Sequence, residues 1–427
     1  MHTITTHRSL AILVAAASMT LPPACWGAGP WLAETGGADM GLAGAGRAAM
    51  SLDAAALASN PAAIGGLSGS TITAAAMPSK LDFEFHGAGQ TTAHATNEEG
   101  INTVPALYAV YRDERLTYGI GAYSYLGLSF DAGNQWEGRR VIEKAGLATF
   151  NIAPTVAWSA TDRLTVGASV AAQLARPEAR MAVANDAMFY GPPAGLPDGQ
   201  VKFSGESWGV GGQLGLTYEA LDDVRLGLAW TAPVDHSVEF DIDAKGLHPV
   251  LATVLASVQP VTLDFTLPQQ VLLGVTRQAG NGTMLSLGLS WQDWSKFGGA
   301  RLRLSGQSTP MFESGLQDTW GASIGARRAF GDGWVGSAGV GYESSPATNG
   351  GVPAYAPVAE QWTIAAGIEH PIADSVRLRA EVSIIFQGDA DVVQTAAPLP
   401  LPGIPSLNGT YEDARVYLFA LAADFRL

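Results

Sequence analysis

An alternation of bulky apolar residues with small or polar residues recurs along almost the whole chain. In the clearest stretch the bulky face is Val376, Leu378, Ala380, Val382, Ile384 and Phe386, and between these residues stand Arg377, Arg379, Glu381 and Ser383. A period of two residues indicates a β-strand with two different faces. The same alternation appears at residues 208–218, 226–230 and 285–291, and again from Tyr411 to Leu427. The chain is therefore expected to fold mainly as β-structure.

The composition narrows the class of β-protein. Beyond the N-terminus, no apolar run reaches the roughly 18 residues that a membrane-spanning helix needs. Only 15% of the 427 residues are charged, whereas about 25% is usual for a soluble domain. Low charge and long strands with a face of Gly, Ser, Arg and Glu favour a transmembrane barrel, apolar outside and polar inside. A secreted β-sandwich or β-helix is the alternative. The net charge of −15 leaves no basic stripe for a nucleic-acid partner.

Connections of two lengths alternate between the predicted strands. Tight turns rich in Asn, Asp and Gly are predicted at 112–114, 160–162, 221–223, 280–282, 331–333 and 373–375. Longer stretches lie at 87–101, 131–145, 179–203, 241–261, 306–314, 346–356 and 388–410. Six turns and seven loops give fourteen antiparallel strands. In outer-membrane barrels the short turns are periplasmic and the long loops extracellular, so both ends of the chain are expected in the periplasm.

The N-terminal residues do not alternate. Residues 1–27 are interpreted as a signal peptide, with a short apolar core before Pro22-Pro23 and a cleavage site after Gly27; a lipoprotein signal is the alternative. The only cysteine, Cys25, lies in this segment, so the mature chain is expected to carry no disulfide or thiolate site. Residues 28–68 are rich in Ala and Gly and are expected to plug the lumen of a barrel formed by residues 69–427.

Aromatic residues fall mostly near the ends of the predicted strands. They are Trp136, Trp158, Trp208, Trp230, Trp291, Trp294, Trp320, Trp334 and Trp362. Such placement favours the membrane interface, where the ring is apolar and its polar group stays hydrated. The last strand carries Phe425 and ends at Leu427, whereas many outer-membrane barrels end in an aromatic residue used by the barrel assembly machinery, which is an expected partner.

Several short motifs, in order, resemble the FadL/TodX family of outer-membrane transporters for long-chain fatty acids and aromatic hydrocarbons. They are Asn60-Pro61-Ala62, Trp136-Glu137-Gly138-Arg139, Gly205-Glu206-Ser207-Trp208-Gly209, Leu267-Pro268-Gln269, Trp294-Ser295-Lys296-Phe297 and Gly341-Tyr342-Glu343. The resemblance implies an all-β fold, a fourteen-stranded barrel in the bacterial outer membrane. It makes Asn60, Pro61 and Ala62 a motif of an N-terminal hatch. It also implies capture of a hydrophobic small molecule at extracellular loops and lateral release past the hatch, with outer-membrane lipid and lipopolysaccharide as surroundings.

Two groups of residues are candidates for cargo contact. Val250, Leu251, Val254, Leu255 and Val258 fall at helical spacing in a long loop and form a candidate capture surface; the alternative is a helix that packs on the barrel rim. The resemblance places Arg176 and Arg301 where fatty-acid transporters hold a carboxylate. Their register instead matches lipid-facing positions. If neither faces the pocket, an uncharged aromatic cargo is favoured.

Signals for catalysis are weak. Gly321-Ala322-Ser323-Ile324-Gly325 matches a nucleophile-elbow pattern but lies within an alternating strand. The seven His show no metal-ligand spacing, so no cofactor, metal or enzymatic activity is predicted.

The leading hypothesis is a passive transporter of long-chain fatty acids. Transport of aromatic hydrocarbons and a general porin for polar solutes are the alternatives.

Overall fold

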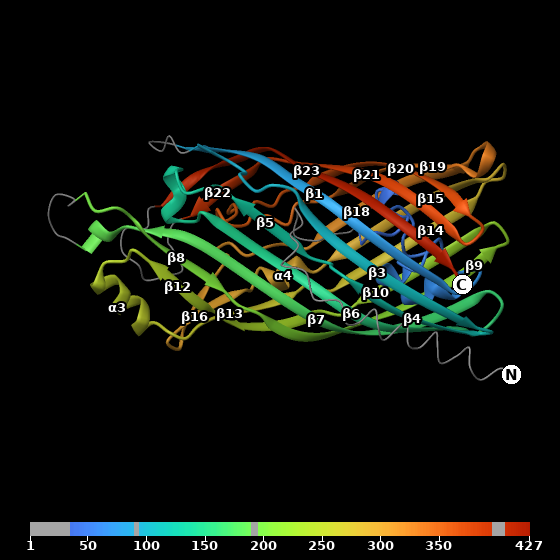
Figure 1. Cartoon of the computed structure of the whole chain (residues 1–427), viewed down its shortest axis with the longest axis horizontal. Helices are drawn as coiled ribbons and strands as arrows, with labels where there is room; N and C mark the ends of the chain where they lie inside the picture. The colour runs from blue at the N-terminus through green and yellow to red at the C-terminus, as the bar shows by residue number, and fades with distance from the viewer. Residues whose placement is uncertain (1–34, 89–93, 189–194, 395–405) are drawn as a thin grey trace.

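Fourteen antiparallel strands close into a barrel in the computed structural model, which describes residues 35–88, 94–188, 195–394 and 406–427 (Figure 1). The barrel strands are β1 (Thr71–Gly87), β3 (Asn102–Asp113), β4 (Leu116–Tyr123), β6 (Lys144–Ser159), β7 (Leu164–Val183), β9 (Ser207–Leu221), β10 (Val224–Thr231), β14 (Gln270–Gln278), β15 (Thr283–Gln292), β18 (Thr319–Ala329), β19 (Val335–Glu343), β20 (Gln361–Ala373), β21 (Val376–Gln387) and β23 (Leu407–Arg426). Each pairs with the next, and β23 pairs with β1 to close the ring. The predicted fold class and strand count are confirmed.

The predicted alternation of short and long connections is present. All six tight turns join neighbouring strands at one end of the barrel, where η5 (Gly331–Gly333) forms one of them. The long connections lie at the other end. They carry β2 (His94–Thr96), β5 (Gly127–Asp131), η3 (Glu137–Arg140), η4 (Asn185–Met188), β8 (Gly199–Ser204), β11 (Val234–Glu239), β12 (Asp241–Lys245), α3 (Pro249–Ser257), β13 (Val261–Leu267), α4 (Trp294–Phe297), β16 (Arg301–Leu304), β17 (Gln307–Pro310) and β22 (Ala390–Gln394).

The apolar face of the strands points outward, as the alternation predicts. Along β21, for example, Leu378 and Phe386 are exposed while Arg379 and Glu381 are buried. Among the described residues, no helix is both long and apolar enough to cross a membrane. A large, exposed apolar outside is the expected surface of a barrel in lipid.

Exposed aromatic side chains lie near both ends of the strands. Near the loop ends of the strands are Trp208, Trp230, Trp320, Tyr342, Trp362 and Phe386, and near the turn ends are Tyr111, Tyr118, Trp158, Tyr218, Phe330, Trp334 and Phe425. These two girdles are the membrane-interface belts that the tryptophan pattern predicts. Two tryptophans differ from the prediction, because Trp136 and Trp294 are only 4% and 1% exposed and pack inside the loop region. Strand-end position alone does not distinguish a girdle tryptophan from one on a loop that folds inward.

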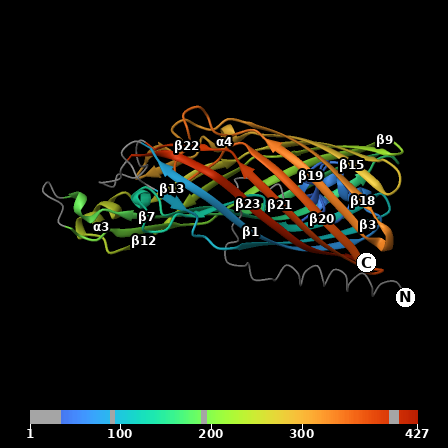
Figure 2. The ribbon, with the colours of Figure 1, turned by 90° about the horizontal axis from the view of Figure 1, so that it is seen from above.

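The N-terminal segment, residues 35–67, lies inside the turn end of the barrel (Figure 1 and Figure 2). It is named the plug segment for this position. It contains η1 (Met40–Leu42), α2 (Ala56–Ser59) and η2 (Pro61–Gly66), and most of its residues are buried. Small wall residues let its backbone approach closely: a Cβ on Gly227 would lie 2.0 Å from the Ala48 carbonyl oxygen. A Cβ on Gly339 would lie 2.1 Å from the Leu42 carbonyl oxygen. The signal peptide predicted for residues 1–27, and the first residues of the predicted plug, lie outside the described residues.

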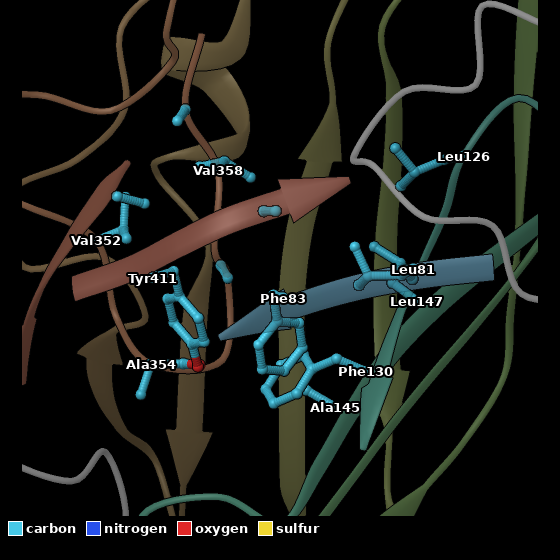
Figure 3. Close-up of a cluster of buried hydrophobic side chains, with 14 of the residues drawn as sticks. Leu81, Phe83, Leu126, Phe130, Ala145, Leu147, Val352, Ala354, Val358 and Tyr411 are labelled. Carbon is cyan, nitrogen blue, oxygen red and sulfur yellow. The ribbon is translucent and has the colours of Figure 1, made fainter. Parts of the chain in front are cut away.

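The loop end extends the barrel and covers its mouth. Strands β8 and β12 continue the wall beyond β7, while β11, β13, β16 and β17 form a separate four-stranded sheet. A large apolar cluster fills the space beneath (Figure 3). In it, the Phe83 ring packs edge-on against Phe130 and Tyr411, with centroids 5.9 and 5.1 Å away. The Tyr411 hydroxyl donates to the Ala354 carbonyl at 2.6 Å, which fixes a loop segment to β23.

Candidate functional site

An apolar cavity lies inside the loop end of the barrel, between the wall and the covering sheet. It holds about 1140 Å³ of space, counted out to its open mouth. Its lining is Val141, Ile142, Ala145, Gly146, Leu147, Pro177, Glu178, Ala179, Met181, Phe203, Phe240, Val261, Leu263, Phe265, Phe297, Ala300, Leu302, Met311, Phe312, Tyr355, Ala356 and Gln394. Aliphatic and aromatic side chains dominate this list, as in sites for hydrophobic ligands.

Few polar groups reach this cavity. The lining includes Glu178, Tyr355 and Gln394 but no Lys, Arg or His among the described residues. The Glu178 carboxylate is paired with Lys144, whose Nζ lies 3.2 Å away, and with Lys202 at 3.5 Å. The Tyr355 hydroxyl donates to the Met311 carbonyl. The cavity therefore offers a ligand mainly dispersion contacts and desolvation of its apolar surface.

The two arginines predicted to hold a carboxylate lie away from this cavity. Arg176 is on the outer register of β7, and its Nη2 lies 3.1 Å from Glu206 Oε2. Arg301 begins β16 on the exposed side, where its Nε donates to Ser308 Oγ at 2.6 Å. The structure does not bring the two together, and neither lines the cavity. Arg176 has the outward register expected from its strand, whereas Arg301 is separated from β15 by α4 and belongs to the covering sheet, so the register of β15 does not extend to it.

The predicted loop helix is α3, at the far end of the molecule from the C-terminus (Figure 1 and Figure 2). Its residues Leu251 and Leu255 are buried against the extended wall and the covering sheet, in a cluster with Val201 and Leu302. Val250 is 45% exposed, and Val254 and Val258 are partly exposed. The helix thus packs on the rim through one face, Val258 also packs against this cluster, and Val250 and Val254 are left at the surface.

A smaller apolar space continues from the cavity toward a break in the barrel wall. The two spaces share Leu147, Phe297, Phe312 and Ala356, and the smaller one ends at the buried Leu126. At this point the β3–β4 ladder has ended, at Leu107–Ala122, and residues 124–126 separate β4 from β5. The facing part of β3, Asn102–Ala106, has ladder partners only on β1. The wall therefore lacks strand pairing next to the end of the apolar space.

The Asn60-Pro61-Ala62 motif joins the plug segment to the wall. Asn60 caps η2, because its Oδ1 accepts from Ala62 N at 2.9 Å, and Pro61 takes the first helical position. The Asn60 Nδ2 donates to the carbonyl oxygens of Ala48 at 2.5 Å and Leu216 at 3.1 Å. One side chain thus connects two parts of the plug segment with β9.

A buried ion cluster, which the sequence interpretation did not identify, also holds the plug segment. Arg379 on β21 donates from Nη1 to Asp53 Oδ2 at 2.5 Å and from Nη2 to the Gly36 carbonyl at 2.9 Å. The neighbouring Glu381 accepts from Gly41 N at 3.0 Å. Arg379 and Glu381 were recognisable as polar residues of an inner face, but the sequence has no periodicity that connects them to Asp53.

With the barrel, its plug segment and its apolar cavity described, comparison with known proteins is informative. A family model described as outer membrane protein transport protein (OMPP1/FadL/TodX) matches residues 18–427. The chain belongs to the OMPP1/FadL/TodX family. It is therefore a transport protein of the bacterial outer membrane, and the family resemblance and the predicted location are confirmed.

Individual relatives are distant. The OMPP1/FadL/TodX chain is 24% identical to a long-chain fatty acid transport protein of Escherichia coli O6:H1, over 91% of this chain and 90% of that protein. Its fold is similar to that of a Pseudomonas aeruginosa FadL homologue, with a TM-score of 0.80 at 17% identity, covering 93% of this chain and all of the other. The Ralstonia pickettii toluene transporter TbuX gives a TM-score of 0.66 at 20% identity, covering 94% and 99%.

Proposed function

We propose that this protein carries hydrophobic molecules passively across the outer membrane, and that long-chain fatty acids are its main cargo. The observation that supports the proposal most directly is the apolar cavity inside a barrel whose turn end is filled by residues 35–67. A polar solute gains nothing from such a cavity, whereas a hydrocarbon chain gains roughly 25 cal/mol for each Å² of apolar surface it buries. The curated relatives named as fatty acid transporters support this choice of cargo.

Uncharged aromatic hydrocarbons are the second candidate cargo. The absence of a basic side chain from the described cavity lining favours them, because a carboxylate would find no cation there. The structural similarity to toluene transporters is consistent with this alternative. For a fatty acid, Arg301 remains our candidate for the carboxylate, and it would act on the outside of the covering sheet.

The proposed route begins at α3, where Val250, Val254 and Val258 would receive the molecule. The cargo would pass into the apolar cavity, continue into the smaller space and leave sideways at residues 124–126. Residues 28–68 would act as a hatch that closes the axial path, held by Asn60 and the Arg379 cluster.

We further infer a cleaved leader at residues 1–27, assembly by the barrel assembly machinery, and no catalytic role.

Lipopolysaccharide is inferred to surround the extended wall. Its outward face is charged rather than apolar beyond the loop-end girdle: Arg180 pairs with Asp131 at 3.1 Å and with Glu143 at 2.9 Å. Lys144 and Lys202 lie on the same face. Such a surface fits the phosphate and sugar layer above the hydrocarbon core better than the core itself.

A paired uptake assay tests the proposed function. Cells lacking their own transporters of this kind would express the protein and be supplied with oleate or toluene as labelled substrate. We expect oleate uptake to depend on the protein. Protein-dependent uptake of toluene alone would select the second candidate, and uptake of neither would reject hydrophobe transport. Single-channel recording tests the porin alternative, because a large steady conductance contradicts a plugged barrel.

A further inference from the structure

The barrel wall has a second gap in strand pairing, at the loop end of β9. The β9–β10 ladder ends at Gln213–Thr231, followed by one hydrogen bond from Ala232 N to Gly212 O at 2.8 Å. Beyond it, residues 207–211 of β9 have ladder partners only on β7. The chain after β10 leaves the wall as β11 and pairs with β13 in the covering sheet. One edge of β9 is therefore left without a ladder partner among the described strands.

Close packing of β11 against β9 maintains this arrangement. A Cβ on Gly209 would lie 2.5 Å from Val234 Cγ1 and 2.9 Å from His236 Cε1. A larger residue at this position would require the Val234 or His236 side chain to shift. Glycine therefore permits the close approach of β11 to β9.

An open groove of about 1050 Å³ occupies the gap. It is lined by Ser207, Trp208, Asp235, His236, Ser237, Asp264, Phe265, Thr266, Lys296, Gly299 and Arg301. Trp208 is 55% exposed and belongs to the loop-end girdle, and the next outward residue, Val210, is 75% exposed. The groove therefore opens where the barrel meets the outer leaflet.

The groove and the cargo cavity meet at one aromatic residue, Phe265. Phe265 lines both spaces and is itself buried. Its ring stacks on His236, with centroids 5.2 Å apart and planes at 23°. His236 is held from the barrel interior by Gln173, whose Oε1 lies 3.0 Å from Nε2. Phe265 is thus the one residue of the two described linings that faces both the groove and the cavity.

The acidic side chains of the groove have hydrogen-bonding or ionic partners, whereas two of its basic side chains have no carboxylate partner in the described part of the chain. Asp264 is neutralised by Arg303, whose Nε lies 2.6 Å from Oδ2, and Asp235 accepts from the Thr266 hydroxyl at 2.6 Å. Lys296 and Arg301 lie at the groove without a carboxylate within salt-bridge distance among the described residues. A molecule with an anionic end and an apolar body would find both kinds of partner here.

We propose that this groove is a side portal, through which anionic amphiphiles pass from the outer leaflet into the cargo cavity, with Phe265 as its gate. The inference rests on the proposed function, since it gives a second way into the same cavity. The cargo's apolar body would lie along Trp208 and Val210, and its anionic end would face Lys296 and Arg301. The groove and α3 would therefore be two separate entries into the same cavity.

Single cysteines distinguish the side portal from capture at α3. Cys25 is the only cysteine of the chain, so a Cys25→Ala background allows one site to be labelled at a time. A bulky methanethiosulfonate reagent would be attached at Ser237→Cys in the groove, at Thr253→Cys on exposed α3, or at both. We expect the label at position 237 to remove a large part of oleate uptake, a reducing agent to restore it, and the label at position 253 to remove only the part that enters at α3.

Other outcomes are decisive as well. Unchanged uptake after complete labelling at position 237 overturns the portal, and so does a doubly labelled protein whose uptake equals that of the protein labelled at position 253 alone. If the unlabelled background protein takes up no oleate, the proposed function fails instead.

Phe265→Ala is expected to raise the uptake rate and Phe265→Trp to lower it. Heat-dependent gel mobility would verify that both variants form the barrel, and unaltered rates in two correctly folded variants would exclude Phe265 as the gate.

Discussion

At the scale of single residues, the inside of the barrel depends on a few buried charges. Arg379 is the centre, because it contacts the plug segment at Asp53 and Gly36 and also lies 3.3 Å from Glu381 and 3.5 Å from Asp424. The sequence showed which side of β21 is polar and that this side faces inward. It could not show the pairing, because Asp53 and Arg379 are separated by most of the chain and belong to different elements.

Replacing Arg379 with Leu is expected to destabilise the protein by about 3–5 kcal/mol, because removal of one member of a buried ion cluster leaves its partners uncompensated. The plug segment should also become accessible to protease added from the periplasmic side. The measurements are denaturant unfolding in detergent and limited proteolysis. Arg277→Leu is the control, since its pair with Asp223 is largely exposed and should contribute no more than about 1 kcal/mol. A stable, protease-resistant Arg379→Leu protein would contradict the role given to this cluster.

At the scale of elements, the strands were more predictable than the loops. All six turns and the inward–outward register followed from local sequence, because a period of two residues and the turn residues act over short distances. The covering sheet of β11, β13, β16 and β17 did not, since its pairings join two different loops. Trp294 and Phe265, which line the cavity system, belong to those loops and were missed as cargo contacts for the same reason.

One loop contact should respond to pH. Asp198, before β8, accepts from Arg139 Nε at 3.0 Å and from Arg140 Nη2 at 2.7 Å, and so holds η3 to the extended wall. Burial acts to raise the pKa of Asp198, but the hydrogen bonds and charges of the two arginines outweigh it and lower the pKa below 3.8. A lowered pKa means that the stabilisation is complete above the unfolded value and is lost as pH falls through the folded one.

We therefore expect the hydrogen-exchange protection factors of this loop, relative to an unstructured chain at the same pH, to stay high from pH 7 down to about pH 4 and to fall below it, in line with an ordinary Asp pKa near 3.9. Asp198→Asn should exchange quickly already at pH 7. Asp222→Asn is the matched control, because the Arg163–Asp222 pair is exposed. If Asp198→Asn exchanged as slowly as the parent protein at pH 7, the ion pair would not hold the loop.

At the scale of the whole molecule, the outer surface determines the environment. Two aromatic girdles border an apolar band, and the charged face of the extended wall begins beyond it. This arrangement was the most predictable of all, because it repeats in every strand and does not depend on any one contact. The cavity, in contrast, is a property of packed loops, so the sequence supported its hydrophobic character only through the family resemblance.

A charge in the middle of that band should be costly. Leu287, halfway along β15 and 46% exposed, faces the lipid, so Leu287→Arg is expected to destabilise the barrel by about 2–4 kcal/mol in bilayers. Gln307→Arg, at an exposed position on β17 outside the band, should have little effect. Folding titrations in lipid vesicles would measure both. Equal stability of the two variants would contradict the assigned membrane position.

The seam between β1 and β23 bears on how the plug reaches its place. The ladder runs from Thr71–Arg426 to Gly87–Gly409, so the ring is complete only when the last strand of the chain has paired with the first. The plug segment precedes β1 and is therefore delivered before any of the wall. The ring can close around a segment already in position, and no later step has to push the segment through a finished opening.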